Sequence, residues 1–138
     1  MDNILMIMFI AVLIVGLALF AYIAAAGKKR SKLDRAYFQS HWQRIEGLQS
    51  QGESGWQLAV MEADKLLDQA LKAAGYPGAT MGDRLKDARR AFRDTDAASQ
   101  SHKLRNRLAL ENDVRLNCIV ASRAPRQFNA GLKDLGAL

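Results

Sequence analysis

The pattern of apolar positions divides the chain into two parts. The first 26 positions are almost entirely apolar, whereas the later positions alternate apolar and polar residues with a helical period. Residues 4–26, ILMIMFIAVLIVGLALFAYIAAA, contain 23 positions without a charge. Because a helix that rises about 1.5 Å per residue needs about 20 apolar residues to cross the hydrocarbon core of a bilayer, this block predicts one transmembrane helix.

A cleaved signal peptide is the alternative interpretation of the same block. Its small residues Ala24–Ala26 resemble an A-x-A cleavage site. However, Asp2 stands where a signal peptide carries Lys or Arg, and the apolar run is longer than the usual core of about 7–15 residues. These features favour an uncleaved transmembrane anchor, which comprises residues 1–27.

A basic juxtamembrane segment, residues 28–36, follows the anchor. Positive charge beside a membrane helix tends to remain in the cytoplasm. We therefore expect a single-pass protein of the cell membrane with its N-terminus outside and residues 37–138 as a cytoplasmic domain. Basic residues near anionic headgroups contribute about 1 kcal/mol each. The candidate lipid-headgroup residues are Lys28, Lys29, Arg30 and Lys32.

Apolar stripes predict the first two helices of the cytoplasmic domain. The first helix, Leu33–Ser50, could continue the membrane helix, and its stripe is Phe38, Trp42, Ile45 and Leu48. After a Gly-rich break, Ser54 or Gly55 leads into a second helix, Trp56–Ala74, and Gly75 is typical of a helix end. The side of the second helix expected to face water consists of Glu62, Asp64, Lys65, Asp68 and Lys72.

Capping residues delimit two further helices. Thr80 is expected to cap a third helix that runs to about Arg93. Its stripe is Met81, Leu85, Ala88 and Phe92. A fourth helix ends near Glu111, and its stripe is Ala97, Ser101, Leu104 and Leu108. The residues that could cap it are Asp94, Thr95 and Asp96.

The last helix is expected to begin after Asn117 and to contain Pro125, which removes a backbone donor and should kink the helix or shorten its first half. No strand pattern is present in the sequence. Because short loops between amphipathic helices favour antiparallel neighbours, the sequence predicts an all-α fold, with a single N-terminal transmembrane helix followed by a small four- or five-helix bundle. A bundle of this size buries limited apolar area, so a homo-oligomer or protein partner would supplement it.

Charge and cysteine content add two expectations. The formal net charge of +6 favours anionic partners. The single cysteine, Cys118, cannot form an internal disulfide, and we expect it to be a small, partly buried core residue.

The segment HKLRNRLALEN, residues 102–112, carries a resemblance to a known family. Together with EADKLLDQALKAAGYPGATMGDRLKDA and FNAGLKDLGAL, it resembles a group of uncharacterised membrane-anchored bacterial proteins, whose middle segment reads R-N-x-[LIV]-[AV]-H-E. That motif is similar to the R-x4-6-H signature of HEPN domains, helical bundles of which many are metal-independent RNases. The resemblance implies candidate motif positions at His102, Arg105, Asn106, Leu110 and Glu111.

One motif position departs from the family pattern. In an active HEPN site, histidine and arginine from two facing protomers would activate the ribose 2′-hydroxyl and stabilise the phosphate. Leu110 stands where the histidine should be, and leucine can neither transfer a proton nor hydrogen-bond. His102 lies three residues before Arg105, so it does not simply replace the missing histidine, but it could still reach the same cleft. The resemblance therefore implies that this chain has no catalytic residue. Together with the anchor and the apolar helix stripes, the missing histidine favours a HEPN-like module that mediates protein interaction or self-association at the cytoplasmic membrane surface.

Two alternative functions are kept open. Basic residues of the third and fourth helices, including Arg84, could form one positive surface in an RNA-binding or RNA-cleaving HEPN relative, or in a binder of anionic lipid surfaces. Interleaved aspartates instead indicate a solvated face with local ion pairs. Arg105 could also bridge Glu111 or an aspartate of a neighbouring helix. The candidate anion- or RNA-binding residues are Arg89, Arg93, Lys103 and Arg107.

Metal and cofactor chemistry has little support in the sequence. His41, His102 and Cys118 show no metal-ligand spacing such as CxxC or HExxH. No Gly-rich loop precedes a Lys-Ser or Lys-Thr pair, as phosphate cradles require. The sequence therefore predicts no metal and no cofactor.

Overall fold

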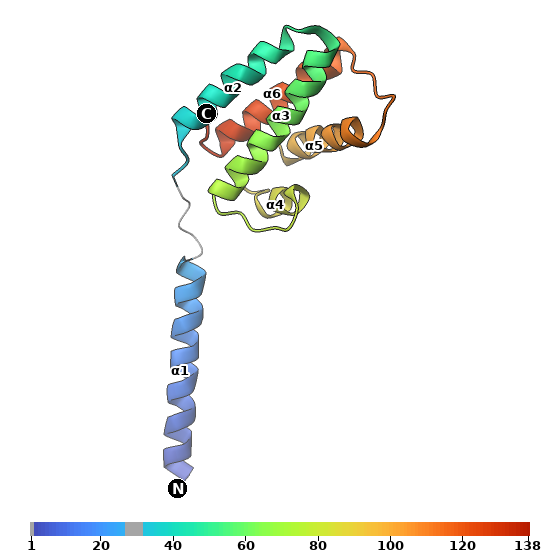
Figure 1. Ribbon diagram of the computed structural model, residues 1–138. Helices are drawn as coiled ribbons and strands as arrows, with labels where there is room; N and C mark the ends of the chain where they lie inside the picture. The colour runs from blue at the N-terminus through green and yellow to red at the C-terminus, as the bar shows by residue number, and fades with distance from the viewer. Residues whose placement is uncertain (1, 27–31) are drawn as a thin grey trace. The chain divides into compact units, whose positions relative to one another are not determined.

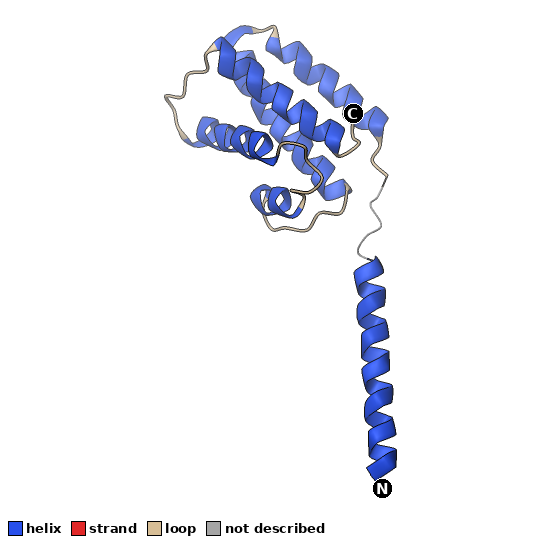
Figure 2. Cartoon of the chain, turned by 180° about the vertical axis from the view of Figure 1, so that it is seen from behind, coloured by secondary structure: helices blue, strands red, loops and turns tan. Residues whose placement is uncertain are grey.

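The computed structural model describes residues 2–26 and 32–138 of the chain. Over these residues the fold consists of six helices and no strand (Figures 1 and 2). The chain divides into two compact units, Met1–Arg30 and Ser31–Leu138. The second unit contains five helices, which confirms the predicted all-α fold with one apolar helix ahead of a small bundle.

The first unit contains helix α1, Asp2–Ala26. Its large apolar side chains are exposed, and the stretch Asn3–Ile23 has a mean hydropathy of 3.1. By length and composition this helix can cross a bilayer, although an N-terminal signal sequence meets the same test. The prediction of one apolar helix of membrane-spanning length is confirmed.

Helices α2, Arg35–Gln49, and α3, Gly52–Ala73, form an antiparallel pair. Asp34 caps α2 by accepting a hydrogen bond from the backbone N–H of Tyr37 at 3.2 Å. Residues 32–34 are not helical, so the expectation that this helix continues the membrane helix is wrong. The expected start of α3 at Trp56 is also wrong. The helix begins about one turn earlier, at Gly52, whose positive φ of 79° allows the chain to turn there.

Helix α4, Met81–Asp87, is shorter than predicted. A reciprocal capping box between Thr80 and Asp83 starts it, as expected. The predicted end near Arg93 is wrong, because turns replace the helix after Asp87. These turns bury Phe92 and let the backbone N–H of Arg93 donate to the Asp134 carboxylate at 2.9 Å, so tertiary contacts replace helical hydrogen bonds.

Helices α5, Thr95–Leu110, and α6, Cys118–Asp134, complete the bundle. The caps are Asp94, one of the three candidates, and Asn117, as predicted. Pro125 is buried inside α6, and the helix continues through it. The expected shortening of α6 is therefore wrong.

Helix α3 is the centre of the bundle, since it packs against each of the other four helices (Figure 1). Its buried side chains meet those of α6, and burial of each large apolar side chain contributes roughly 1.5–3 kcal/mol. The largest apolar side chains that are fully buried at this contact are Val60, Leu67, Leu71, Phe128 and Leu132. A rigid central helix thus positions the polar side chains that α3 directs toward α5.

Candidate functional site

Asp64 is a buried carboxylate on α3 with only 3% of its surface exposed. The expectation that it faces water is wrong. Asp64 follows Val60 by four residues and precedes Leu67 by three, so it belongs to the same helical face as these core residues. A buried carboxylate is costly unless charged or hydrogen-bonded partners surround it, and the partners of Asp64 lie on α5.

Two residues of the predicted motif are the partners of Asp64. The Nδ1 atom of His102 lies 2.8 Å from Oδ1 of Asp64, and Nε of Arg105 lies 3.4 Å from Oδ2. Arg105 interacts with Asp64 as an ion pair without a hydrogen bond, because its buried Nε has no hydrogen-bond partner among the described residues. Both carboxylate oxygens are therefore occupied by side chains of α5.

Asn106 completes the network and defines its hydrogen-bond directions. Nη1 of Arg105 donates to Oδ1 of Asn106 at 3.1 Å. Since arginine only donates, the amide oxygen faces Arg105 and the amide nitrogen faces Nε2 of His102, 3.3 Å away. In this arrangement Nε2 is placed to accept from Asn106 and Nδ1–H to donate to Asp64. His102, Arg105 and Asn106 are thus brought together on Asp64; we name these four residues the Asp64 network.

Leu110 and Glu111 lie away from the Asp64 network. Leu110 is 84% exposed, because five residues rotate it about 140° around the helix from Arg105. Glu111 pairs with Arg107, with Nε and Oε2 3.6 Å apart, so the expected alternative of an Arg105–Glu111 bridge is wrong. The other alternative, a bridge from Arg105 to an aspartate of a neighbouring helix, is confirmed by Asp64.

An open groove of about 420 Å³ lies over the Asp64 network. It is lined by Met61, Glu62, Asp64, Lys65, Asp68, Thr80, Met81, His102, Arg105 and Asn106. Within the ranges 2–26 and 32–138, no group of three His, Cys, Asp or Glu side chains is close enough to hold a metal ion. The groove therefore presents atoms of an ion-paired network rather than a metal-ligand set.

A second buried ion pair joins α3 to the start of α4. Arg84 is 7% exposed, and its Nε donates to Oδ1 of Asp68 at 2.7 Å while Nη1 donates to the Gly78 carbonyl at 2.6 Å. The expectation that Arg84 belongs to an exposed positive surface is wrong. Partial burial raises the pKa of the Asp68 carboxyl, but hydrogen bonds and positive charge from Arg84 and Lys72 outweigh it and hold this pKa below its ordinary value.

The remaining basic candidates are exposed, and some have acidic partners. Arg93 pairs with Asp134, with Nε and Oδ1 3.3 Å apart, and Arg107 pairs with Glu111. The other exposed candidates are Arg89, Lys103 and Lys32, whereas Lys28, Lys29 and Arg30 lie outside the described residues. Cys118, the first residue of α6, is exposed, so its expected place in the core is wrong.

No family model, no curated protein and no solved structure matches this chain. The resemblance to HEPN domains therefore rests on the motif residues themselves. The fold and the site together define a small helical bundle, preceded in the sequence by an apolar helix, in which a buried Asp64 holds the polar motif residues of α5.

Proposed function

We propose that the chain is a membrane-tethered, non-catalytic, HEPN-like helical module that mediates protein interaction or self-association at the cytoplasmic membrane surface. The observation that supports it most directly is the engagement of both His102 and Arg105 by the buried Asp64. Arg105 is the side chain that an RNase of this kind would need for phosphate binding. His102 is the single histidine of α5, because Leu110 stands at the motif position of the proton-transfer residue.

The hydrogen-bond directions in the Asp64 network argue against proton transfer. A general base needs a nitrogen lone pair that faces the substrate, but Nε2 of His102 already accepts from Asn106 and Nδ1 faces Asp64. The charge of Arg105 is balanced by a carboxylate within its own bundle, which weakens its attraction for a phosphate. In this proposal the network locks α5 onto α3 instead of performing catalysis.

The apolar helix supports the tether. In the proposed topology α1 spans the cell membrane, and the contrast between Asp2 and the basic residues of 28–36 supports a cytoplasmic position of the bundle. Confinement to a membrane surface raises the effective concentration of a partner confined there too, so a weak contact suffices. Leu110 and Ile119, 84% and 66% exposed, provide apolar atoms for such a contact.

Site-specific photo-crosslinking in native membranes tests this proposal. The full chain would carry a benzophenone amino acid at position 110, and a matched chain would carry it at Lys86, an exposed residue of α4. We expect discrete protein-sized adducts from position 110 and few from position 86. In parallel, the purified full chain should leave single-stranded RNA intact. Absence of adducts at position 110, or RNA cleavage that is lost on Arg105→Ala, would overturn the proposal.

A further inference from the structure

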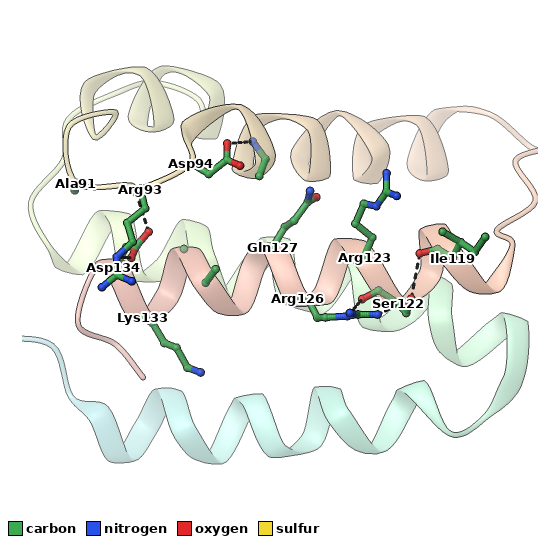
Figure 3. Close-up of a pocket in the computed structure, with 13 residues that line it drawn as sticks. Ala91, Arg93, Asp94, Ile119, Ser122, Arg123, Arg126, Gln127, Lys133 and Asp134 are labelled. Atoms are coloured by element: carbon green, nitrogen blue, oxygen red, sulfur yellow. Dashed lines mark hydrogen bonds and ion pairs between the residues drawn. The ribbon is translucent and has the colours of Figure 1, made fainter.

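The outward face of α6 forms the floor of a trough between α5 and α2. One groove of about 930 Å³ lies on the α5 side, and another of about 510 Å³ lies on the α2 side. The two grooves share Ser122, Arg126 and Lys133 of α6, so they meet along the outward face of this helix; we name the two grooves together the α6 trough. Figure 3 shows Arg123 and Gln127 pointing toward α5, and Lys133 pointing toward α2.

One line of residues along the floor of the α6 trough carries both cationic and apolar side chains. Residues of this face recur at spacings of three and four and so follow the helix axis. They are Ile119, Arg123, Arg126, Ala130 and Lys133. Ala130 is small, as is Ala97 on the α5 side, so these positions leave room for a backbone or small side chain of a partner. Ile119 supplies a large exposed apolar group at one end.

The acidic residues at the edges of the α6 trough already have partners. Asp94 caps α5, Asp134 pairs with Arg93, and Glu46 accepts a hydrogen bond from the Trp42 indole at 2.9 Å. Among the described residues, none of these three carboxylates lies within ion-pair distance of Arg123, Arg126 or Lys133.

The basic residues on the floor lack such compensation. Arg126 donates only to the neutral Ser122 carbonyl and hydroxyl, at 3.1 and 3.2 Å. In the described part of the chain, neither Arg123 nor Lys133 has a carboxylate within ion-pair distance. The floor of the trough therefore presents positive charge that an outside carboxylate can pair with.

The spacing of these charges matches a helical partner. Arg123 and Lys133 are ten residues apart, which corresponds to about 15 Å along the helix axis. A partner helix with a carboxylate at every third or fourth residue of one face presents negative charges along the same length of α6. Single-stranded nucleic acid usually needs exposed aromatic side chains for base stacking, and the one aromatic residue lining the trough, Trp42, is buried.

We propose that the α6 trough docks an acidic amphipathic helix of a partner protein. This inference rests on the proposed interaction function and gives it a surface and a partner chemistry. The apolar face of the partner helix packs on Ile119 and Ala130, while its carboxylates pair with Arg123, Arg126 and Lys133. Such helix-in-groove recognition takes its affinity from apolar contact and its specificity from charge.

Binding of a defined peptide to the full chain in detergent micelles tests the trough. The probe is a fluorescent helical peptide of about 15 residues, with leucine and alanine on one face and glutamate beside it at helical spacing. The matched control peptide carries glutamine at every glutamate position. We expect at least tenfold tighter binding of the glutamate peptide. We also expect this preference to weaken as salt is raised, because salt screens exposed charges.

Two double variants distinguish the effect of the charges inside the α6 trough from the effect of the net charge of the chain. Arg123→Glu with Arg126→Glu reverses charge inside the trough, while Lys103→Glu with Arg107→Glu makes the same change on the exposed side of α5. We expect at least a tenfold loss of glutamate-peptide affinity for the first pair and less than a threefold change for the second. Circular dichroism should show that both variants stay folded; if the first does not, Arg123→Gln with Arg126→Gln replaces it.

Several results would overturn this inference. They are equal binding of the two peptides, equal loss in the two double variants, or trough-dependent binding of polyuridine or of anionic phosphatidylglycerol vesicles without peptide binding. Self-association that the trough variant abolishes would identify the occupant as a second copy of the chain. If adducts form at position 110 but the glutamate peptide does not bind, only the proposal of docking in the α6 trough is wrong. If no adducts form at position 110, the proposed interaction function itself is wrong.

Discussion

His102 and Asp64 stand 38 residues apart in the sequence, and their Nδ1 and Oδ1 atoms lie 2.8 Å apart in the fold. This contact joins α5 to the central helix α3 through polar atoms beside a small apolar interface. On α5, Ala98 and Ser101 are buried, and Leu104 and Leu108 pack against the core while partly exposed. The Asp64 network adds a polar link to this apolar contact between α5 and α3.

Asp64→Ala should destabilise the bundle. It removes the hydrogen-bond partner of His102 and the charge partner of Arg105 at a partly buried interface. The cost should be about 1–3 kcal/mol for each group left unsatisfied. Thermal unfolding of the full chain in micelles, followed by circular dichroism, measures it. Glu62→Ala, an exposed acidic change on the same helix, should alter stability by less than about 0.5 kcal/mol.

Leu110→His restores the residue type expected at that motif position. We expect no RNA cleavage, because position 110 is exposed and points away from the Asp64 network. The change should leave the melting temperature nearly unaltered, since surface substitutions usually stay within about 0.5 kcal/mol. A fluorogenic single-stranded RNA checks this, with the unaltered chain as control. Cleavage by the variant would show that position 110 reaches the network from a facing copy.

Stability below about pH 4 should depend on Asp68. Its pKa is lowered in the folded state, because the hydrogen bonds and charges of Arg84 and Lys72 outweigh partial burial. The stabilisation is therefore fully present above the unfolded-state pKa and is lost as pH falls through the lower folded-state pKa. Melting temperatures between pH 2 and pH 6 should fall less steeply with acid in Asp68→Asn, with Asp87→Asn controlling for the loss of one carboxylate. Equal acid slopes for Asp68→Asn and the unaltered chain would contradict this.

Two helical glycines should respond in opposite directions to alanine. A Cβ at Gly55 would overlap the Leu48 carbonyl oxygen at the α2–α3 turn, so Gly55→Ala should destabilise by about 1–3 kcal/mol through forced backbone shifts. A Cβ at Gly47 meets nothing within 4 Å, so Gly47→Ala should stabilise α2 by about 0.5–1 kcal/mol. Paired thermal melts measure both changes. The same sign for both would contradict the close contact at Gly55.

Local signals in the sequence predicted most of the helices. The caps at Thr80 and Asn117, and the end of α3 before Gly75, depend on neighbouring residues only, and all three are confirmed. The early end of α4 was not predictable in this way, because it depends on the burial of Phe92 and on the contact between Arg93 and Asp134. Those contacts join parts of the chain that are distant in sequence.

The site was predicted in part. The motif predicts that His102, Arg105 and Asn106 lie close together on one helix. Asp64 is expected to face water, because charged residues are rarely buried without partners. Its spacing from Val60 and Leu67 was the signal that could have placed it on the core face. The cationic face of α6 was also visible as a regular spacing from Ile119 to Lys133, but the walls that make it a trough come from α5 and α2 and depend on the fold.

The exposed thiol of Cys118 makes the native chain its own probe of sidedness. Because it is the single cysteine of the sequence, a membrane-impermeant maleimide can modify one position only. Intact cells should protect this thiol if the bundle is cytoplasmic, and permeabilised cells should expose it. A single labelling experiment on the unaltered protein therefore reports on which side of the membrane the bundle lies.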